Sequence, residues 1–113
     1  MNGFERFRSA IADEDHTITV VAFSELDLDS VEDLRKIVDR CLLVEGVRLL
    51  VVDMSQVNFC DCSGVGALME ARERTLQRRI SFELTEVKEP IVMRLFTLTG
   101  TDALFGLDLP TWR

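Results

Sequence analysis

The run of residues 47–53, Val-Arg-Leu-Leu-Val-Val-Asp, constrains the fold of this chain more than any other segment. It is nearly continuous in apolar and β-branched residues and has the length of a strand. Runs of this kind are typical of a central strand covered on both faces, so we expect it to be the most buried element. With 113 residues, 47% of them hydrophobic, the chain can build one core around that strand, and residues 1–113 are expected to form a single domain.

A β-hairpin is expected near the N-terminus. Residues 17–23 are rich in β-branched residues and largely alternate between apolar and polar. Residues 4–11 are expected to pair with them across the acidic turn at residues 12–16.

A helix is predicted to follow this hairpin. Ser30 and Asp33 have the spacing of a capping box, although Glu or Gln is more usual at the second position. Apolar residues then recur at helical spacing, at Val31, Leu34, Val38, Cys41 and Leu42. The helix is expected to end near Gly46, which suits a left-handed C-cap.

The second half of the chain continues this alternation of strands and helices. A loop at residues 54–61 leads into a second helix, whose apolar face is predicted at Val65, Leu68, Met69 and Leu76. Residues 80–85 alternate strictly and predict a half-buried strand. Pro90 suits the first turn of a third helix that runs to Gly100, and residues 104–107 are expected to add a short turn or strand.

The predicted order is therefore β-β-α-β-α-β-α, which defines an α/β fold. Its β-α-β units require right-handed crossovers and a largely parallel centre of the sheet. Such folds place functional loops at the carboxyl ends of their strands. The loop at residues 54–61 is in that position.

Composition narrows the classes of partner. The formal net charge of −7 argues against nucleic acid, because affinity for a phosphate backbone comes mainly from Lys and Arg. Much of the negative charge lies at residues 13–15 and 25–33, which favours a basic protein partner.

The longest apolar run, residues 49–52, is too short to span a bilayer, so no membrane association is expected. The N-terminus lacks the apolar segment of a secretory signal, and three cysteines suit a reducing compartment, which together predict a cytoplasmic protein.

Residues 58–66, Asn-Phe-Cys-Asp-Cys-Ser-Gly-Val-Gly, contain the main candidate site. In one interpretation Ser63 simply caps the second helix, while Gly64 and Gly66 let that helix approach the sheet and Asp61 satisfies donors in the loop. In the other, the helix N-terminus is suited to a phosphate on Ser63. A phosphate would add about −1.5 to −2 charges beside Asp61 and expel a partner docked there.

At these residues the sequence resembles the STAS family, named for sulfate transporters and anti-sigma factor antagonists. Residues 25–29, Glu-Leu-Asp-Leu-Asp, resemble the family's Gly-Glu-Leu-Asp signature. The pattern Phe-x-Asp-x-Ser-Gly-Val-Gly at residues 59–66 matches its phosphoacceptor motif, and residues 92–105 resemble its closing helix and turn. The resemblance implies a mixed four- to five-stranded β-sheet with α-helices packed against it.

The resemblance also implies a function. The family includes anti-sigma factor antagonists, which bind an anti-sigma factor that is a serine kinase and so release a sigma factor for transcription. Phosphorylation of Ser63 would abolish this binding, and a separate metal-dependent serine phosphatase would restore it. The implied partner-binding residues are Ser24, Asp27, Asp61, Cys62, Ser63, Gly64 and Val65.

Two positions depart from the family pattern, and a second function stays open. Cys62 stands where serine or threonine is more frequent, and Ser24 where glycine usually opens the signature. Since some members act without phosphorylation, the alternative is a constitutive interaction subunit of a transporter or signalling assembly. The oligomeric state is left open by the sequence.

Other chemistry is less favoured by the residues present. Zinc needs four ligands, and besides Cys60 and Cys62 the chain offers only Cys41 and His16, so neither a metal nor a cofactor is expected. Cys62 is interpreted as a small residue buried under the helix. His16 falls in the acidic turn and is a poor base for Ser63, so no enzymatic activity is expected. The second helix and its end carry the arginines Arg72, Arg74, Arg78 and Arg79. We interpret them as part of a solvated helix face, with i,i+4 pairing to Glu70 and Glu73.

Overall fold

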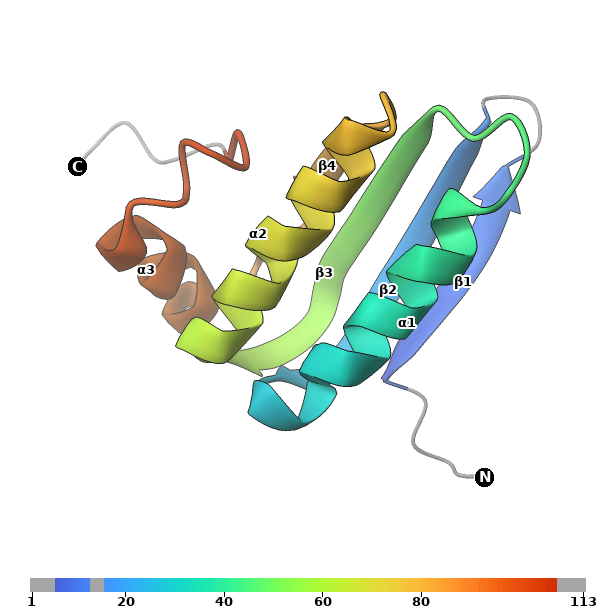
Figure 1. The fold of residues 1–113 in the computed structure, drawn as a ribbon. Helices are drawn as coiled ribbons and strands as arrows, with labels where there is room; N and C mark the ends of the chain where they lie inside the picture. The colour runs from blue at the N-terminus through green and yellow to red at the C-terminus, as the bar shows by residue number, and fades with distance from the viewer. Residues whose placement is uncertain (1–5, 13–15, 108–113) are drawn as a thin grey trace.

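A computed structural model describes residues 6–12 and 16–107, which form one mixed sheet with helices against it (Figure 1). The strands are β1 (Phe7–Ala12), β2 (Thr17–Leu26), β3 (Leu49–Cys60) and β4 (Ser81–Thr85). They lie in the order β1-β2-β3-β4, with β1 antiparallel to β2 and the other two pairs parallel. The helices are the 3₁₀ turn η1 (Leu28–Ser30), α1 (Val31–Leu42), α2 (Cys62–Gln77) and α3 (Pro90–Thr99). The predicted order of elements, the pairing of the hairpin strands and the fold class are confirmed, while residues 4–5 and 13–15 of the predicted hairpin lie outside the described residues.

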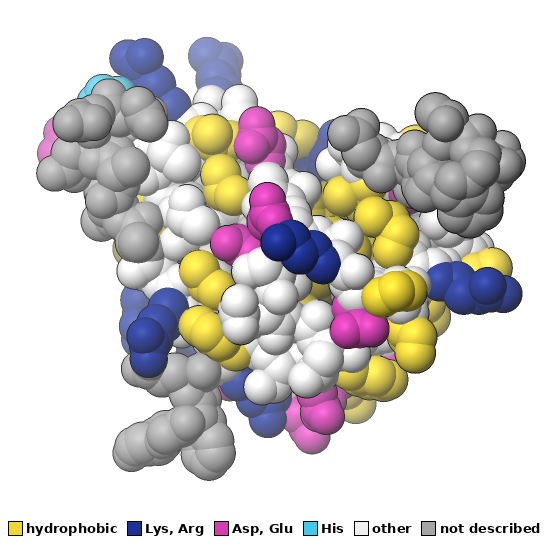
Figure 2. Space-filling model, turned by 180° about the vertical axis from the view of Figure 1, so that it is seen from behind, with side chains coloured by type: hydrophobic (Ala, Val, Ile, Leu, Met, Phe, Trp, Pro, Cys, Tyr) yellow, Lys and Arg dark blue, Asp and Glu magenta, His cyan; other side chains and the backbone are white. Residues whose placement is uncertain are grey.

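The central strand is β3, as its apolar run predicts, but only one of its faces is fully covered. Leu50, Val52 and Met54 are buried beneath the helices, with at most 1% of their surface exposed. Leu49 and Val51, on the other face, are half-buried. The helices α1 and α2 both lie in front of the sheet in Figure 1, and Figure 2 shows hydrophobic, acidic and basic side chains intermixed on the side seen from behind. Because the second face is only half-buried, full coverage of the strand on both faces was a wrong prediction.

The predicted loop at residues 54–61 is wrong as well, because β3 continues to Cys60. It stays paired because β2 also extends beyond Phe23, and Leu26 lies in register with Cys60. The pairing absorbs two register shifts, between Val21 and Phe23 and between Ser24 and Glu25. A stretch without regular alternation of apolar and polar residues is thereby held as strand by backbone hydrogen bonds to its neighbour.

The first helix begins directly after Ser30, as predicted, but its capping and its end differ from the prediction. The Ser30 hydroxyl is buried and bonds to Asp27, accepting its N–H and donating to its C=O, both at 2.9 Å. The hydroxyl therefore closes the η1 turn, and Ser30 makes no side-chain cap to α1. The helix ends at Leu42, and Gly46 adopts its left-handed φ of 84° in the turn beyond.

The second helix packs on the sheet through small residues. Its buried positions are Gly64, Val65, Ala67, Leu68, Ala71 and Thr75. Met69 and Leu76 are each 42% exposed, so their predicted place on the buried face is wrong. Gly64 is the tightest contact: a Cβ there would overlap the Leu26 carbonyl oxygen and lie 2.9 Å from the Cys60 Sγ. The expected close approach is thus confirmed for Gly64, whereas a Cβ at Gly66 meets nothing within 4 Å.

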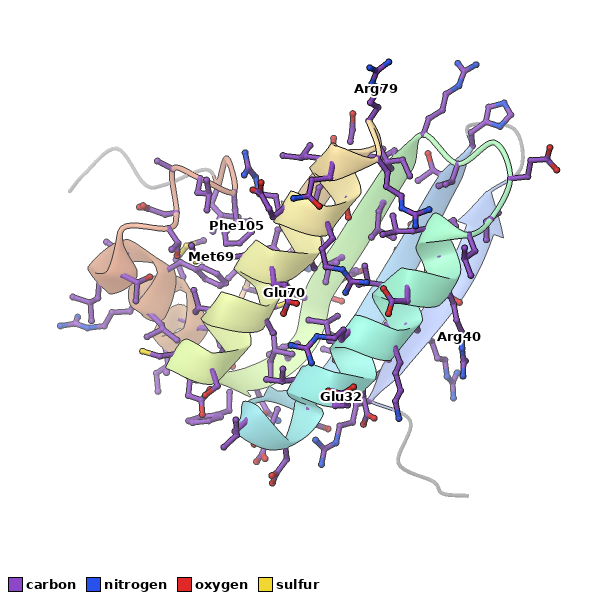
Figure 3. The ribbon with its side chains drawn as sticks, viewed as in Figure 1. Glu32, Arg40, Met69, Glu70, Arg79 and Phe105 are labelled. Atoms are coloured by element: carbon purple, nitrogen blue, oxygen red, sulfur yellow. The ribbon has the colours of Figure 1, made fainter. Side chains whose placement is uncertain are left out.

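Ion pairs join α2 to α1 across their exposed sides. Glu70 accepts hydrogen bonds from Arg35 of α1, the shorter being 3.0 Å, and Figure 3 shows Glu70 between the two helices. Arg74 pairs with Asp39 of α1. These contacts replace the predicted i,i+4 pairs within the helix, while Arg79 points away beyond its end (Figure 3). Because these pairs are exposed, water and salt screen them, and they add little to the stability of the fold.

The third helix agrees with its prediction. Pro90 occupies its first turn and Gly100, at φ 75°, ends it. Phe96 is fully buried and meets Phe105 edge-on, with ring centroids 5.6 Å apart. Phe105 lies in the turn that follows α3, which settles residues 104–107 as a turn. Across the described residues no helix is both long and apolar enough to cross a membrane.

The two glycines of α2 give a matched test of its contact with the sheet. We expect Gly64→Ala to lower the free energy of unfolding by about 2 kcal/mol or more, because its Cβ must displace the Leu26 carbonyl. Gly66→Ala should raise it by about 0.5–1 kcal/mol, since alanine favours the helix and the site is open. Urea denaturation of both variants measures the difference, and equal effects would contradict the close approach.

Candidate functional site

The site forms where two neighbouring parallel strands end. Leu26 ends β2 and Cys60 ends β3, and the two residues are in register. The Asp61 N–H donates to the Leu26 carbonyl at 3.2 Å, which ties the residues after both strands together. Asp27 and Asp61 therefore lie at the same edge of the sheet, at the bottom of Figure 1, where η1 meets the start of α2.

Asp61, and not Ser63, caps α2. The Asp61 carboxylate accepts the Gly64 N–H at 3.0 Å, and its carbonyl accepts the Val65 N–H at 3.0 Å. Asp61 has the extended backbone of an N-cap residue, and Ser63 is the second residue of the helix. The interpretation of Ser63 as the cap is therefore wrong, and the helix does not need the Ser63 hydroxyl in that role.

The surroundings of Ser63 combine a positive helix end with nearby carboxylates. The first N–H groups of a helix have no partner within the helix, and its dipole adds a partial positive charge there. Ser63 is half-buried in this first turn, between Asp61 and the buried Gly64. Added negative charge at Ser63 would be stabilised by the helix end and would raise the negative charge already present at Asp27 and Asp61.

The predicted site residues differ in how much they reach the surface. Ser24 and Cys62 are exposed, whereas Asp27, Asp61 and Ser63 are half-buried. Gly64 and Val65 are buried, and they shape the site from beneath. The exposed Cys62 contradicts its interpretation as a residue buried under the helix; at the first helical position its side chain points away from the core.

Ser24 has a backbone conformation that explains the glycine more usual at its position. Its φ is 64°, in the left-handed region. A residue with a Cβ pays roughly 1–2 kcal/mol there, and glycine does not. The conformation coincides with the register shift between Ser24 and Glu25, which lets β2 follow β3 to the edge of the sheet.

Two exposed apolar residues at this edge were not singled out from the sequence. Leu28 of η1 is 70% exposed and Phe59, near the end of β3, is 44% exposed. Leu28 lies within residues 25–29 and Phe59 within residues 59–66, where the polar neighbours of each carry the stronger signal. Since large apolar side chains at an edge lined by carboxylates are typical of contact surfaces, they extend the candidate site.

The cysteines differ in burial, and the histidine lies away from the site. Burial raises the pKa of the Cys60 thiol to about 12, with a smaller contribution from Asp61, and that of Cys41 to about 11. No group of three His, Cys, Asp or Glu side chains in the described part of the chain could hold a metal ion. The exposed His16 precedes β2, at the opposite end of that strand from Asp27.

Known proteins share this fold. The STAS domain family model matches residues 9–112. An anti-sigma factor antagonist from Mycobacterium paratuberculosis has a TM-score of 0.74 and 22% identity, over 98% of this chain and 92% of that one. The anti-sigma factor antagonist SpoIIAA matches at 21% identity in its unphosphorylated form, with a TM-score of 0.62 over 81% of this chain and 82% of that one. Its phosphorylated form, from Bacillus, has a TM-score of 0.64 at 21% identity over 86% of each chain.

A much longer protein also contains such a domain. The murine Solute Carrier 26 family member A9 anion transporter matches with a TM-score of 0.68 and 20% identity, over 79% of this chain and 14% of that one. At these identities the solved structures establish the fold alone. The family model covers nearly all of the sequence, and this chain belongs to the STAS domain family.

The exposure of the cysteines predicts their reactivity. At pH 8 a thiol with a pKa of about 12 is ionised in about one molecule in ten thousand, and Cys60 and Cys41 are in addition buried. We expect Cys62 alone to react rapidly with a disulfide reagent in the native protein, and the other two to react only with unfolding. Cys62→Ser should remove the fast phase in the absorbance trace; a fast phase that persists would show that Cys41 or Cys60 reaches solvent.

Proposed function

We propose that this protein is an anti-sigma factor antagonist whose partner binding is switched by phosphorylation of Ser63. The observation that carries the proposal is the division of roles at the start of α2. Asp61 caps the helix, which leaves the Ser63 hydroxyl available for modification at a helix end that tolerates a phosphate. Phosphorylation can thus change the surface without removing an interaction on which the helix depends.

The proposed docking face consists of η1, the end of β3 and the start of α2. Its acidic residues are Asp27, Asp61 and the exposed Asp29 of η1, and Leu28 and Phe59 supply apolar area. Exposed apolar side chains beside charged groups suit a partner with a hydrophobic centre and basic residues around it. The partner is an anti-sigma factor with serine kinase activity, and its capture by the unphosphorylated protein releases a sigma factor.

The phosphate acts through charge and volume. It adds about −1.5 to −2 charges next to Asp61, on a face built for contact. A kinase surface fitted to the free hydroxyl then meets a larger, more negative group, and the complex dissociates. A separate serine phosphatase restores the binding form.

This chain is proposed to be the substrate of these reactions and to catalyse none. The carboxylate nearest to Ser63 in sequence, Asp61, is engaged as the helix cap. A nucleophilic serine needs an oriented base, and His16 belongs to the other end of β2. The proposal treats residues 1–113 as one cytoplasmic domain that needs no cofactor and binds no nucleic acid.

A second candidate function follows from the likeness to the anion transporter. There the similar domain is part of a longer protein, and it covers 14% of that chain. In this alternative the same face makes a permanent contact in a transporter or signalling assembly, and Ser63 is never modified. Labelling of Ser63 separates the two functions.

The Ser63 hydroxyl is the first test. Incubation with ATP and a kinase-type anti-sigma factor should phosphorylate the protein at Ser63, as detected by mass spectrometry. Ser63→Ala should bind the kinase with unchanged affinity and gain no phosphate. Ser63→Asp should bind at least about tenfold more weakly, a loss of about 1.4 kcal/mol, because it places a negative charge at the docking face.

The folded state provides the control for this test. Ser63→Asp should keep the circular dichroism spectrum of the parent protein, because a carboxylate is tolerated at a helix N-terminus. Phosphate on the Ser63→Ala variant would move the acceptor to another residue. Undiminished kinase affinity of a folded Ser63→Asp variant in calorimetry would contradict the docking model.

The apolar residues of the face are tested separately. Leu28→Ala and Phe59→Ala should each weaken kinase binding by about fivefold to tenfold, since truncation of a central apolar contact costs at least about 1 kcal/mol. Leu43→Ala is the matched control: Leu43 is 74% exposed and follows the far end of α1. A similar loss for all three variants would argue against this location of the interface.

A further inference from the structure

Arg6 lies beside the docking face, although it precedes the first strand. Its Nη1 atom is 3.9 Å from the Asp27 Oδ1. Its backbone is fixed as well, because its carbonyl accepts the Phe23 N–H at 2.7 Å. Arg6 also precedes residues 9–112, the span that the family model matches. The contact therefore joins Asp27, inside the matched span, to a residue outside it.

The two charged atoms are buried and neither is satisfied by a hydrogen bond. Arg6 Nη1 and Asp27 Oδ1 have almost no accessible surface and no hydrogen-bond partner. Their separation is too long for a hydrogen bond, so the attraction between them is that of two opposite charges. Burial excludes water from the pair and strengthens this attraction. Each charge would be costly to leave buried without the other.

The Asp27 carboxylate takes part in this pair and also in a capping box at η1, where it faces the Ser30 backbone. The backbone of Asp27 is held by Ser30, through two hydrogen bonds of 2.9 Å. The carboxylate itself has Arg6 as its ion-pair partner. With Oδ1 turned inward, the side chain is still 22% exposed, so the remainder of it is presented at the surface in one direction.

We propose that Arg6 is a positioning residue that orients Asp27 for the partner kinase. The inference rests on the function proposed above and assigns this residue a role in the same docking face. Without Arg6, the carboxylate turns toward water to recover hydrogen bonds, and it must be reoriented when the partner binds. Arg6 thus stabilises the binding conformation of Asp27 before the partner arrives.

A double-mutant cycle in this protein tests this role, with the affinity for the kinase that labels Ser63 as the measured quantity. Arg6→Gln removes the charge and keeps most of the side-chain length, and it should weaken kinase affinity about fivefold at low salt. Asp27→Asn should also weaken binding, and Arg6→Gln should add nothing in the Asp27→Asn background, because the two residues act through one contact. Arg6→Lys should restore most of the affinity. In phosphorylation assays the KM should rise for Arg6→Gln while kcat stays constant.

Arg8→Gln is the matched control. Arg8 lies on β1, two residues from Arg6, and its guanidinium is 5.7 Å from the centre of the Phe23 ring. The substitution removes the same charge only two residues away, so unchanged affinity for Arg8→Gln separates the Asp27 contact from a general effect of net charge. Equal losses for Arg6→Gln and Arg8→Gln would overturn the inference.

The outcomes also distinguish this inference from the proposed function. If the kinase labels Ser63 but binds Arg6→Gln as tightly as the parent protein, the inference fails and the function stands. If no kinase labels Ser63, the function fails. The coupling between Arg6 and Asp27 is then measured from the urea denaturation midpoints of the parent protein, the two single variants and the double variant. Additive shifts of the midpoints then overturn the inference, and coupled shifts support the orientation of Asp27 by Arg6.

Discussion

The close approach of Gly64 to the Leu26 carbonyl is the constraint on which the site depends. The same carbonyl accepts the Asp61 N–H, so the end of β2 is joined to the start of α2 at two successive points. Any side chain at Gly64 would separate them. Because η1 follows β2 directly, the contact also fixes where Asp27 and Leu28 stand relative to Ser63. Two motifs more than thirty residues apart in sequence become one surface through a glycine.

Much of the architecture follows from local patterns. Four elements have a periodicity or a terminal residue that agrees with the structure. They are the hairpin, the apolar start of β3, the alternating β4 and the helix between Pro90 and Gly100. The second half of β3 carries none, because its apolar residues Met54, Val57, Phe59 and Cys60 do not alternate regularly with polar ones. It is a strand only because β2 bends with it through two register shifts. That support is a tertiary effect, which residues 54–60 do not encode by themselves.

The candidate site shows the same division between local and tertiary information. Asp and Ser are nearly equal as N-caps, so spacing could not decide between Asp61 and Ser63. Which of the two caps α2 depends on the direction in which the chain leaves β3, and the length of β3 sets that direction. The exposure of Cys62 and Phe59 follows from the same geometry. Arg6 was not identified at all, since only the folded hairpin brings it beside Asp27.

The capping of α2 by Asp61 has a consequence for how such a protein can be regulated in a cell. A modification site that also held its helix together would link signalling to turnover, because each modified molecule would unfold more often and be degraded sooner. Here the residue that secures the helix and the residue proposed to receive the phosphate are different. The amount of the protein and the fraction of it in each state can therefore be set independently, by synthesis on one side and by opposing enzymes on the other.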